Sequence, residues 1–359
     1  MHSRFGSSVN ENELPMSIGK KILVATDAWY PQVNGVVRTW DNVSAALKEM
    51  GHEVRILSHQ GKRTFSLPSY KEIGLAWFSQ NEIRDIISEF GPDNIHIATE
   101  GPIGLAVRRY CLNHGLEFTT SYHTRFAEYA QARLPIPGVE RLAYRFLRWF
   151  HRPSQAVLAP TKMVSKELKE RGFKRVFTWT RGVDHATFRD YGEKAPANWN
   201  KPIMVYVGRL AVEKGIDDFL ELPNQGTKLV IGDGPNREML QMKYPKCHFT
   251  GYLFGEALAR MVNRGDVFVF PSKTDTFGLV MIEAMACGLP VAAYPVTGPV
   301  DVVEHGVSGY LDDDLEVAVD AALELAPESA LKHASAFTWQ NTAHMLLEHL
   351  RILPKKYRD

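Results

Sequence analysis

The sequence predicts an α/β protein made of two doubly wound domains, each built on a parallel sheet between helices. Three observations predict this class. The chain has 359 residues, which suits two domains of ordinary size. Short apolar runs alternate with segments of helical periodicity, as in βαβ units. The alternation then restarts after a polar segment with two prolines, residues 190–202, which is the expected linker.

The first domain is expected at residues 20–188. Residues 1–19 lack the apolar core of a signal peptide, so we interpret them as a flexible leader, with Met16 as an alternative start. Strands are predicted at 21–27, 53–59, 94–99, 118–123 and 156–161, with helical patterns between them.

The second domain is expected at residues 189–335. Its strands are predicted at 202–210, 228–234, 247–253, 267–272 and 290–295. Residues 336–359 contain a further helix, which either completes this domain or crosses back and braces the first. Ligands of such sheets bind outside the carboxyl ends of the strands, so the two domains are expected to face each other across a cleft.

Composition is that of an ordinary soluble enzyme, with 45% hydrophobic and 23% charged residues. The three cysteines are dispersed without metal spacing, which favours a reducing cytoplasm. Residues 1–180 hold 24 Lys+Arg and 17 Asp+Glu, net +7, whereas residues 181–359 hold 18 and 24, net −6. A basic first half favours contact with an anionic surface; a chance distribution is the alternative.

Two common nucleotide motifs are missing from the sequence. No G-x-G-x-x-G follows a predicted strand, and IGDGPN (231–236) has only two glycines, which argues against a dehydrogenase. No P-loop pattern is present either, which argues against an NTPase.

Three loops at predicted strand ends carry candidate ligand groups. In VGRLAVEKG (207–215), Arg209 and Lys214 are spaced to reach one diphosphate; solvated loop charges are the alternative. In PQVNGVVRTW (31–40), Gly35 lets backbone approach a ligand beside a helix start; an ordinary turn is the alternative. In SYHTRF (121–126), His123 and Arg125 end an apolar strand, and His123 is either a sugar or phosphate contact or a structural histidine.

The stretch TDTFGLVMIEAMACGLPV (274–291) is the most informative. Asp275 precedes a helix predicted to start near 277 or 278, and Glu283 lies inside that helix. A buried carboxylate needs a partner, and a ribose diol supplies one, while the helix start supplies amides to phosphates. The alternative is a helix-capping Asp275 with an exposed Glu283.

Together these motifs resemble those of retaining glycosyltransferases of family 4, which have the GT-B fold of two Rossmann-like domains. The resemblance covers about residues 20–335 and rests on NGV, SYHT, GRL-x3-KG and the acid-x7-acid helix. It implies that Arg209 and Lys214 stabilise the leaving diphosphate, and that Asp275 and Glu283 hold the donor sugar and the ribose. It further implies donor contacts for Gly35, His123, Phe277, Gly278 and Leu279.

Two positions depart from the family pattern. The first acid is usually Glu, and Asp275 is one methylene shorter. TGPVD (297–301) replaces the usual GGxPE, which weakens the roles of Thr297 and Gly298. The resemblance implies retention, with same-face attack by the acceptor assisted by the leaving phosphate. No metal or other cofactor is expected, because cations and the helix start stabilise the leaving group.

The segment ERLAYRFLRWFHRPS (140–154) is the basis of our prediction about the acceptor. Arg141, Arg145, Arg148 and Arg152 form one stripe of a predicted helix, and Leu142, Phe146, Trp149 and Phe150 occupy a neighbouring face. This pattern favours an interfacial helix on anionic lipid; a packed helix with a solvated arginine face is the alternative. We therefore expect peripheral attachment to the inner face of the membrane and no nucleic-acid partner.

The chain also resembles the lipid-glycosylating branch of the family through TDAWYPQVNGVVRT, SYHT and RGVD. That branch includes sulfoquinovosyl-, glucosyl- and glucuronosyl-diacylglycerol synthases and phosphatidylinositol mannosyltransferases. It implies transfer of a hexosyl or hexuronosyl group from a nucleotide sugar, expected to be a UDP-sugar, to a membrane lipid such as diacylglycerol. Arg181 stands where many family members have Asn, and it is a candidate partner for an acidic sugar or a lipid phosphate.

Three other functions stay open. The first alternative is a glycosyltransferase whose acceptor is a soluble sugar, a polysaccharide or a lipopolysaccharide. The second is a nucleotide-sugar epimerase, against which Arg209 and the paired acids argue. The third is a non-catalytic protein that binds nucleotide sugars.

Overall fold

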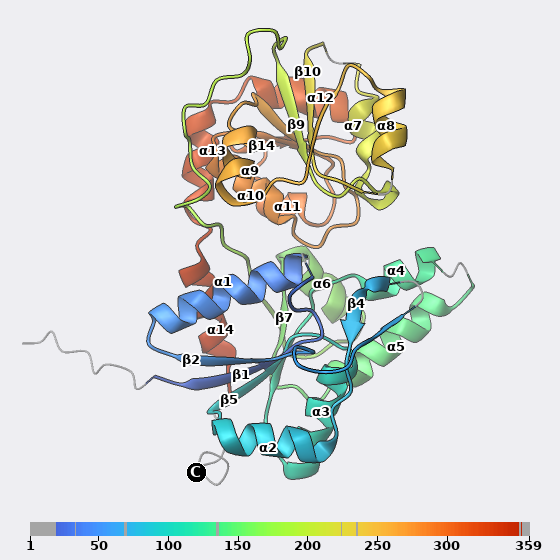
Figure 1. Ribbon diagram of the computed structural model, residues 1–359, viewed down its shortest axis with the longest axis vertical. Coiled ribbons are helices and arrows are strands. Elements are labelled where there is room, and N and C mark those ends of the chain that lie inside the picture. The colour runs from blue at the N-terminus through green and yellow to red at the C-terminus, as the bar shows by residue number, and fades with distance from the viewer. Residues whose placement is uncertain are drawn as a thin grey trace, which may run out of the picture.

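A computed structural model of the 359-residue chain describes residues 19–32, 34–67, 70–133, 136–223, 225–234, 236–351 and 353. The leader predicted at 1–19, with Met16, lies outside these residues except for Gly19. The described chain forms two α/β domains, the first below the second in Figure 1.

The first domain holds a six-stranded sheet in the order β2-β1-β5-β6-β7-β8, and every neighbouring pair is parallel. Its strands are β1 (Lys21–Ala25), β2 (Glu53–Leu57), β5 (Asn94–Ile97), β6 (Thr119–Ser121), β7 (Val157–Ala159) and β8 (Val176–Thr178). Its helices are α1 (Gly35–Glu49), α2 (Gln80–Phe90), α3 (Pro102–His114), α4 (Phe126–Arg133), α5 (Val139–His151) and α6 (Lys162–Glu170). The hairpin β3 (Phe65–Leu67) and β4 (Tyr70–Leu75) forms a separate small sheet.

The second domain repeats this plan in the order β11-β10-β9-β12-β13-β14, again wholly parallel. Its strands are β9 (Ile203–Val207), β10 (Thr227–Ile231), β11 (His248–Gly251), β12 (Val267–Phe270), β13 (Val291–Ala293) and β14 (Gly309–Leu311). Its helices are α7 (Ile216–Leu220), α8 (Arg237–Lys243), α9 (Gly255–Val262), α10 (Leu279–Ala286), α11 (Pro299–Val302), α12 (Leu315–Leu323) and α13 (Pro327–Ala334), with the 3-10 turn η1 (Val212–Lys214).

The patterns that predicted this fold are visible in its packing. The central strands β5 and β12 are buried at every residue, as expected for a sheet covered by helices on both faces. Helix starts follow their capping signals: Asn34 caps α1 through the amides of Val36 and Val37, and Ser79 with Glu82 forms a capping box on α2. The predicted class, two doubly wound α/β domains, is confirmed.

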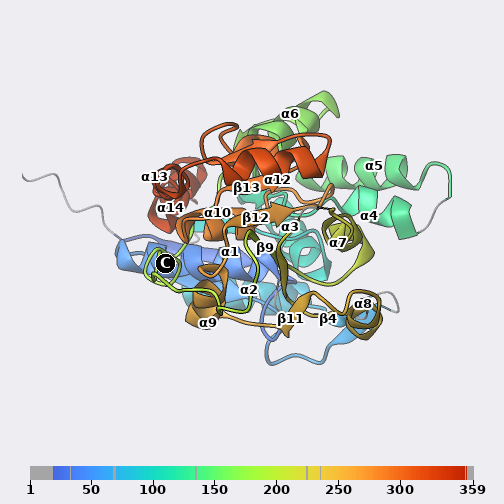
Figure 2. The ribbon, with the colours of Figure 1, turned by 90° about the horizontal axis from the view of Figure 1, so that it is seen from above.

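The last helix returns to the first domain. α14 (Trp339–His349) packs on α1, and Trp339, Ala343 and Leu346 are buried in the same apolar cluster as Trp40 of α1. In the two ribbon views the chain passes from α13 in the second domain to α14 beside the first (Figures 1 and 2). Of the two placements considered for this segment, the structure has the crossing one.

Candidate functional site

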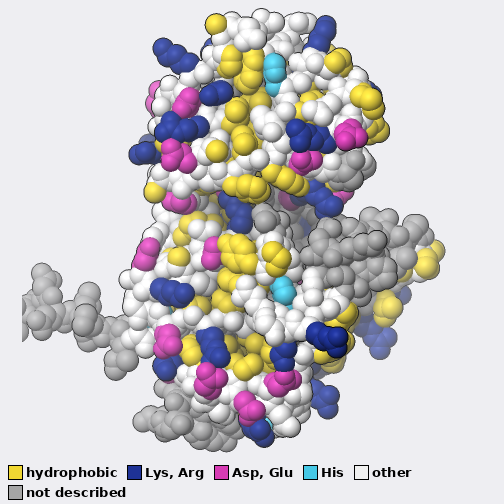
Figure 3. All heavy atoms as spheres, viewed as in Figure 1, with side chains coloured by type: hydrophobic (Ala, Val, Ile, Leu, Met, Phe, Trp, Pro, Cys, Tyr) yellow, Lys and Arg dark blue, Asp and Glu magenta, His cyan; other side chains and the backbone are white. Residues whose placement is uncertain are grey.

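The two domains meet through polar contacts between loops at the carboxyl ends of their strands. The Thr276 hydroxyl donates to the His123 carbonyl at 2.9 Å, and Arg125 Nη2 donates to Thr297 Oγ1 at 3.0 Å. Arg38 of α1 forms an ion pair with Glu283 of α10. The space-filling view shows Lys and Arg side chains where the molecule narrows between the domains (Figure 3).

The start of α10 is shaped by one glycine. Gly278 precedes Leu279, the first residue of the helix, with φ of 81° and no side-chain cap. A Cβ at Gly278 would lie 2.8 Å from Met281 Cε and 2.9 Å from Phe270 Cζ, so the position requires glycine. Phe277 is buried against Phe337 in the core of the second domain. The helix therefore begins without a side-chain cap, and its first amides point toward the domain interface with the positive end of the helix dipole.

Two loops of the second domain interlock beside this helix start. Lys214 Nζ bonds Asp275 Oδ1 at 2.6 Å, and the Thr274 hydroxyl donates to the Glu213 carbonyl at 3.1 Å. Arg209, on the loop after β9, is exposed, and its carbonyl accepts a bond from Tyr206 at 2.9 Å. The structure thus brings Lys214 and Asp275 together, and it does not make Asp275 the helix cap.

Glu283 is buried, at 5% exposure, so the alternative of an exposed glutamate is wrong. Its Oε1 pairs with Arg38, while its Oε2 has no hydrogen-bond partner. Burial raises the pKa of the Glu283 carboxyl, and the nearby Arg38 opposes this rise. A buried oxygen without a donor is unfavourable, so Oε2 is positioned to accept a bond from a ligand.

His123, which follows β6, lies among several donors. Trp40 Nε1 is 3.1 Å from its Nε2, Ser121 Oγ is 2.9 Å from the same nitrogen, and Arg181 Nη2 is 3.2 Å from Nδ1. Burial lowers the pKa of His123 well below its ordinary value, and the Arg181 charge lowers it further. His123 is therefore a neutral imidazole in this structure.

Gly35 is the first residue of α1, and it is exposed. A Cβ built there meets nothing within 4 Å. Local packing therefore gives no reason for glycine at this position, unlike at Gly278. Its open side is consistent with close backbone approach to a ligand.

Arg38 was not predicted as a site residue. It stands in the first turn of α1, where a cation is unfavourable because the amino end of a helix is already positive. That placement was the signal available in the sequence, since a misplaced cation needs an acidic partner. Glu283 is that partner.

The arginines predicted to form a stripe on one helix, Arg141, Arg145, Arg148 and Arg152, are all exposed on α5 or just after it. The residues of the neighbouring apolar face differ in their exposure. Leu142 and Trp149 are exposed, at 67% and 52%, whereas Phe150 is buried in the core of the first domain and Phe146 packs against that core. One face of Trp149 is covered by the Arg108 guanidinium, 3.9 Å from the ring centre.

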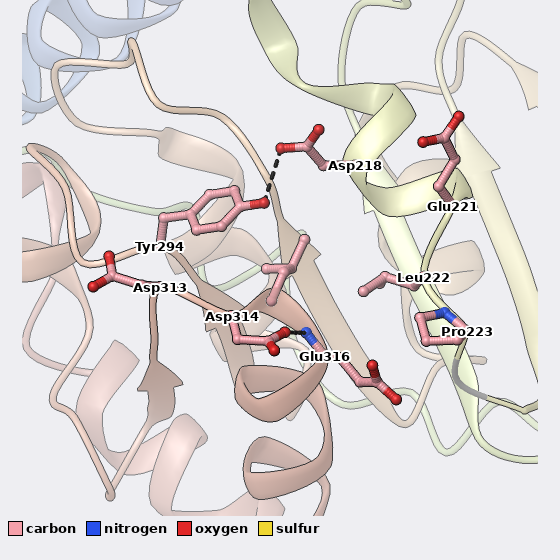
Figure 4. A pocket seen from close by; sticks show the side chains of 9 residues that line it. Asp218, Glu221, Leu222, Pro223, Tyr294, Asp313, Asp314 and Glu316 are labelled. Carbon is pink, nitrogen blue, oxygen red and sulfur yellow. Dashed lines mark hydrogen bonds between the residues drawn. The ribbon is translucent and has the colours of Figure 1, made fainter.

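Two hollows are lined by other residues of the described chain. One, of about 370 Å³, is lined by the acidic residues Asp218, Glu221, Asp313, Asp314 and Glu316, with Tyr294 bonded to Asp218 (Figure 4). Its charge disfavours a diphosphate. The other, of about 670 Å³, lies where the loops after β1 and β2 meet and is lined by Tyr30, Pro31, His59, Gln60, Gly61, Lys62 and Thr64.

Neither a metal site nor a membrane span is found in the described chain. Among those residues no group of three or more His, Cys, Asp or Glu is arranged to hold a metal ion. No helix within the same residues has the length and apolarity needed to cross a bilayer.

Two facing Rossmann-like domains, with an acid-bearing helix start turned toward the interface, define a GT-B glycosyltransferase. The chain belongs to glycosyltransferase family 4: the Glycosyltransferase Family 4 domain matches residues 33–187, and the Glycosyl transferases group 1 domain matches residues 201–327.

Similar proteins include a GDP-mannose-dependent alpha-mannosyltransferase of Mycobacterium tuberculosis, 30% identical over 82% of this chain and 84% of the relative. A sulfoquinovosyl transferase of Arabidopsis thaliana is 28% identical over 79% of this chain and 61% of the relative. A GDP-mannose-dependent phosphatidylinositol dimannoside mannosyltransferase of M. tuberculosis is 26% identical over 92% and 96%.

Among solved structures, sucrose-phosphate synthase from Thermosynechococcus elongatus has a similar fold. Its TM-score is 0.74 at 20% identity, over 92% of this chain and 98% of that chain. This similarity confirms the GT-B fold that the sequence motifs implied.

Proposed function

We propose that this protein is a retaining glycosyltransferase that transfers a hexosyl or hexuronosyl group from a nucleotide-diphosphate sugar to a membrane lipid. The observation that carries the donor side is the buried Glu283 oxygen without a partner, beside the uncapped start of α10. A ribose diol satisfies that oxygen, and the helix amides and Arg209 receive the diphosphate.

The chemistry follows from these groups. As the bond between sugar and diphosphate breaks, negative charge grows on the leaving phosphate. Arg209, Lys214 and the helix start stabilise it without a metal ion. Asp275, bonded to Lys214 in this structure, exchanges that contact for hydroxyls of the transferred sugar. The acceptor hydroxyl attacks from the same face, which retains the configuration.

The nucleotide is left open between UDP and GDP. The family resemblance implies a UDP-sugar, whereas two of the similar enzymes are named for GDP-mannose. Both bases therefore belong in the test.

A lipid acceptor is supported by two independent observations. One of the similar enzymes is named for a phosphatidylinositol dimannoside acceptor. The exposed arginine stripe with Leu142 and Trp149 gives the first domain a basic and partly apolar face that suits anionic lipid. The hollow beside Tyr30 offers room for the acceptor headgroup near the donor loop. We place the protein peripherally on the inner face of the membrane.

The test is transfer on liposomes that contain anionic lipid and diacylglycerol or phosphatidylinositol, with a panel of UDP- and GDP-sugars and mass spectrometry of the lipids. A new glycolipid with retained anomeric configuration is the expected product. Nucleotide release without a lipid product would support the transferase activity and would indicate that the acceptor is a soluble sugar or a polysaccharide. Binding of nucleotide sugar without any turnover would contradict the proposal.

Liposome flotation tests the membrane face separately. Replacing the four stripe arginines with glutamine is expected to move the protein from the liposome fraction to the supernatant. A matched variant loses the same charge from exposed arginines elsewhere, namely Arg84, Arg109, Arg189 and Arg260. Equal loss of binding in both variants would contradict a specific role for α5.

A further inference from the structure

Arg181 is a buried guanidinium with only neutral partners. It follows β8 and is 3% exposed. It donates to the carbonyls of Trp179 at 2.6 Å and Thr180 at 3.2 Å, lies over the Trp179 ring at 4.6 Å, and reaches Nδ1 of His123. Within the described part of the chain it forms no ion pair. A buried charge without a counter-charge is costly, and an arginine cannot escape that cost by losing its proton.

The His123 ring faces more hydrogen-bond donors than it can accept from. Arg181 faces Nδ1 of His123, and the Trp40 indole N–H faces Nε2. A neutral imidazole accepts at one nitrogen and carries hydrogen on the other, so it cannot accept from both. In either tautomer one of these two donors has no acceptor in the ring. The ring therefore cannot accept from both donors, and within the described residues the guanidinium has no counter-charge.

This cluster adjoins the donor site. The His123 carbonyl accepts the bond from Thr276, the residue next to Asp275. Leu279, at the start of α10, packs against the apolar cluster that contains Trp40 and Trp179. A sugar held by Asp275 and His123 would thus present one edge toward Arg181.

We propose that Arg181 and His123 form a subsite for an anionic substituent, a carboxylate or a sulfonate, on one of the two substrates that meet at the transfer site. The anion accepts from Arg181 Nη2 and from Nδ1–H of His123, while Trp40 donates to Nε2. Each donor then has one acceptor, and the guanidinium has its counter-charge. This inference rests on the proposed function, because it assumes that a transferred sugar and an acceptor meet beside His123.

The source of the anion is the donor sugar or the acceptor headgroup, and matched pairs separate them. The donor pairs are UDP-glucose with UDP-glucuronate and GDP-mannose with GDP-mannuronate. The acceptor pair is glucosyl-diacylglycerol with glucuronosyl-diacylglycerol. Wild-type enzyme is expected to prefer the anionic member of either the donor pairs or the acceptor pair by about tenfold to hundredfold in kcat/KM.

Variants at Arg181 then test the residue itself. Arg181→Gln is expected to lower kcat/KM for the anionic member far more than for the neutral member, so that the ratio of the preferred pair falls close to one. Arg181→Lys is expected to retain most of the preference. The matched control is Arg189→Gln, since Arg189 also lies over an aromatic ring, 4.8 Å from Tyr191, but is exposed. It is expected to leave the ratio unchanged.

Equal wild-type rates for both members of every pair would overturn the proposal. So would an Arg181→Gln variant that lowers kcat/KM for anionic and neutral members alike, because that is the result of a merely structural role. Equilibrium titration of the same pairs reads the preference without turnover. Retained anionic preference without transfer rejects only the proposed function, whereas transfer without the preference rejects only this inference.

Discussion

Arg38 in the first turn of α1 and Glu283 inside α10 form an ion pair that joins the two domains. The residues are 245 positions apart in the sequence. Glu283 is the carboxylate to which we assign the nucleotide ribose, so Arg38 occupies one of its two oxygens before any donor arrives. A ribose diol that bonds both carboxylate oxygens must displace Arg38 from Oε1, so donor binding is expected to compete with an interdomain contact.

Replacing Arg38 with alanine is expected to tighten nucleotide binding severalfold, because the competitor of the ribose is gone. The measurement is calorimetric titration of both proteins with UDP and GDP. Arg55→Ala is the matched control, since Arg55 pairs with Glu89 within the first domain. Weaker binding in the Arg38 variant would mean that Arg38 holds the nucleotide itself.

Two glycines that look alike in the sequence are expected to respond in opposite ways to alanine. Gly278→Ala forces a Cβ at φ of 81° against Met281 and Phe270, so the free energy of unfolding is expected to fall by about 1–3 kcal/mol. Gly35→Ala meets open space, so stability is expected to stay within about 0.5 kcal/mol while donor kcat/KM falls at least about tenfold. Urea unfolding and donor kinetics measure both. If the Gly35 variant had unchanged donor kinetics, the loop around Gly35 would not belong to the donor site.

Transfer is expected to survive metal removal. The leaving diphosphate is assigned to Arg209, Lys214 and the start of α10, which supply positive charge without an ion. Activity after dialysis against EDTA is expected to match that of the untreated enzyme, and added Mg²⁺ or Mn²⁺ is expected to change it little. Loss of activity that a divalent ion restores would show that the site needs a metal.

Stability is expected to fall in mild acid because of a buried neutral histidine. Burial lowers the pKa of His96 from 6.5 to about 3. The unfolded chain binds a proton near pH 6.5 and the folded chain does not, so this contribution is complete above pH 6.5 and is lost as pH falls toward 3. The contribution of His96 to the free energy of unfolding then changes by up to about 1.4 kcal/mol per pH unit.

His96→Asn is expected to flatten this slope between about pH 7 and pH 5, which urea unfolding at several pH values measures. The exposed His305 supplies the matched variant, His305→Asn, for which the slope should stay as in the wild type. Identical slopes in both variants would assign the acid sensitivity to other groups.

The last helix is expected to stabilise the domain that it contacts rather than the one that precedes it. Leu346→Ala empties a fully buried position beside α1 and is expected to cost about 2–5 kcal/mol. Hydrogen exchange should quicken in α1 and β1 and stay unchanged in β12 and β13. Val317→Ala, at an exposed position of α12, is the control. Faster exchange confined to the second domain would contradict this assignment.

The fold was readable in the sequence because buried parallel strands are continuous apolar runs. All ten predicted strands have counterparts, but the hairpin β3–β4 and the edge strands β8 and β14 were not predicted. The strands β8 and β14 are only partly buried, unlike the equally short β6, β7 and β13, so they are not continuous apolar runs. The buried Glu283 was predicted from its place in an apolar helix. Its pairing with Arg38 was not predicted, because an interdomain contact leaves no periodic trace in either segment.

The two domains are joined twice, once by the chain that leaves β8 and once by the segment that leads into α14. A single cut in the first connection would leave the two products associated, because α14 of the second product would stay packed on α1 of the first. Exchange of whole halves between related enzymes is constrained in the same way. A transplanted second domain brings its own final helix, and that helix must fit a surface with which it did not evolve. Chimeras meant to change the sugar therefore need their junctions on both sides of the second domain, with the original α14 retained.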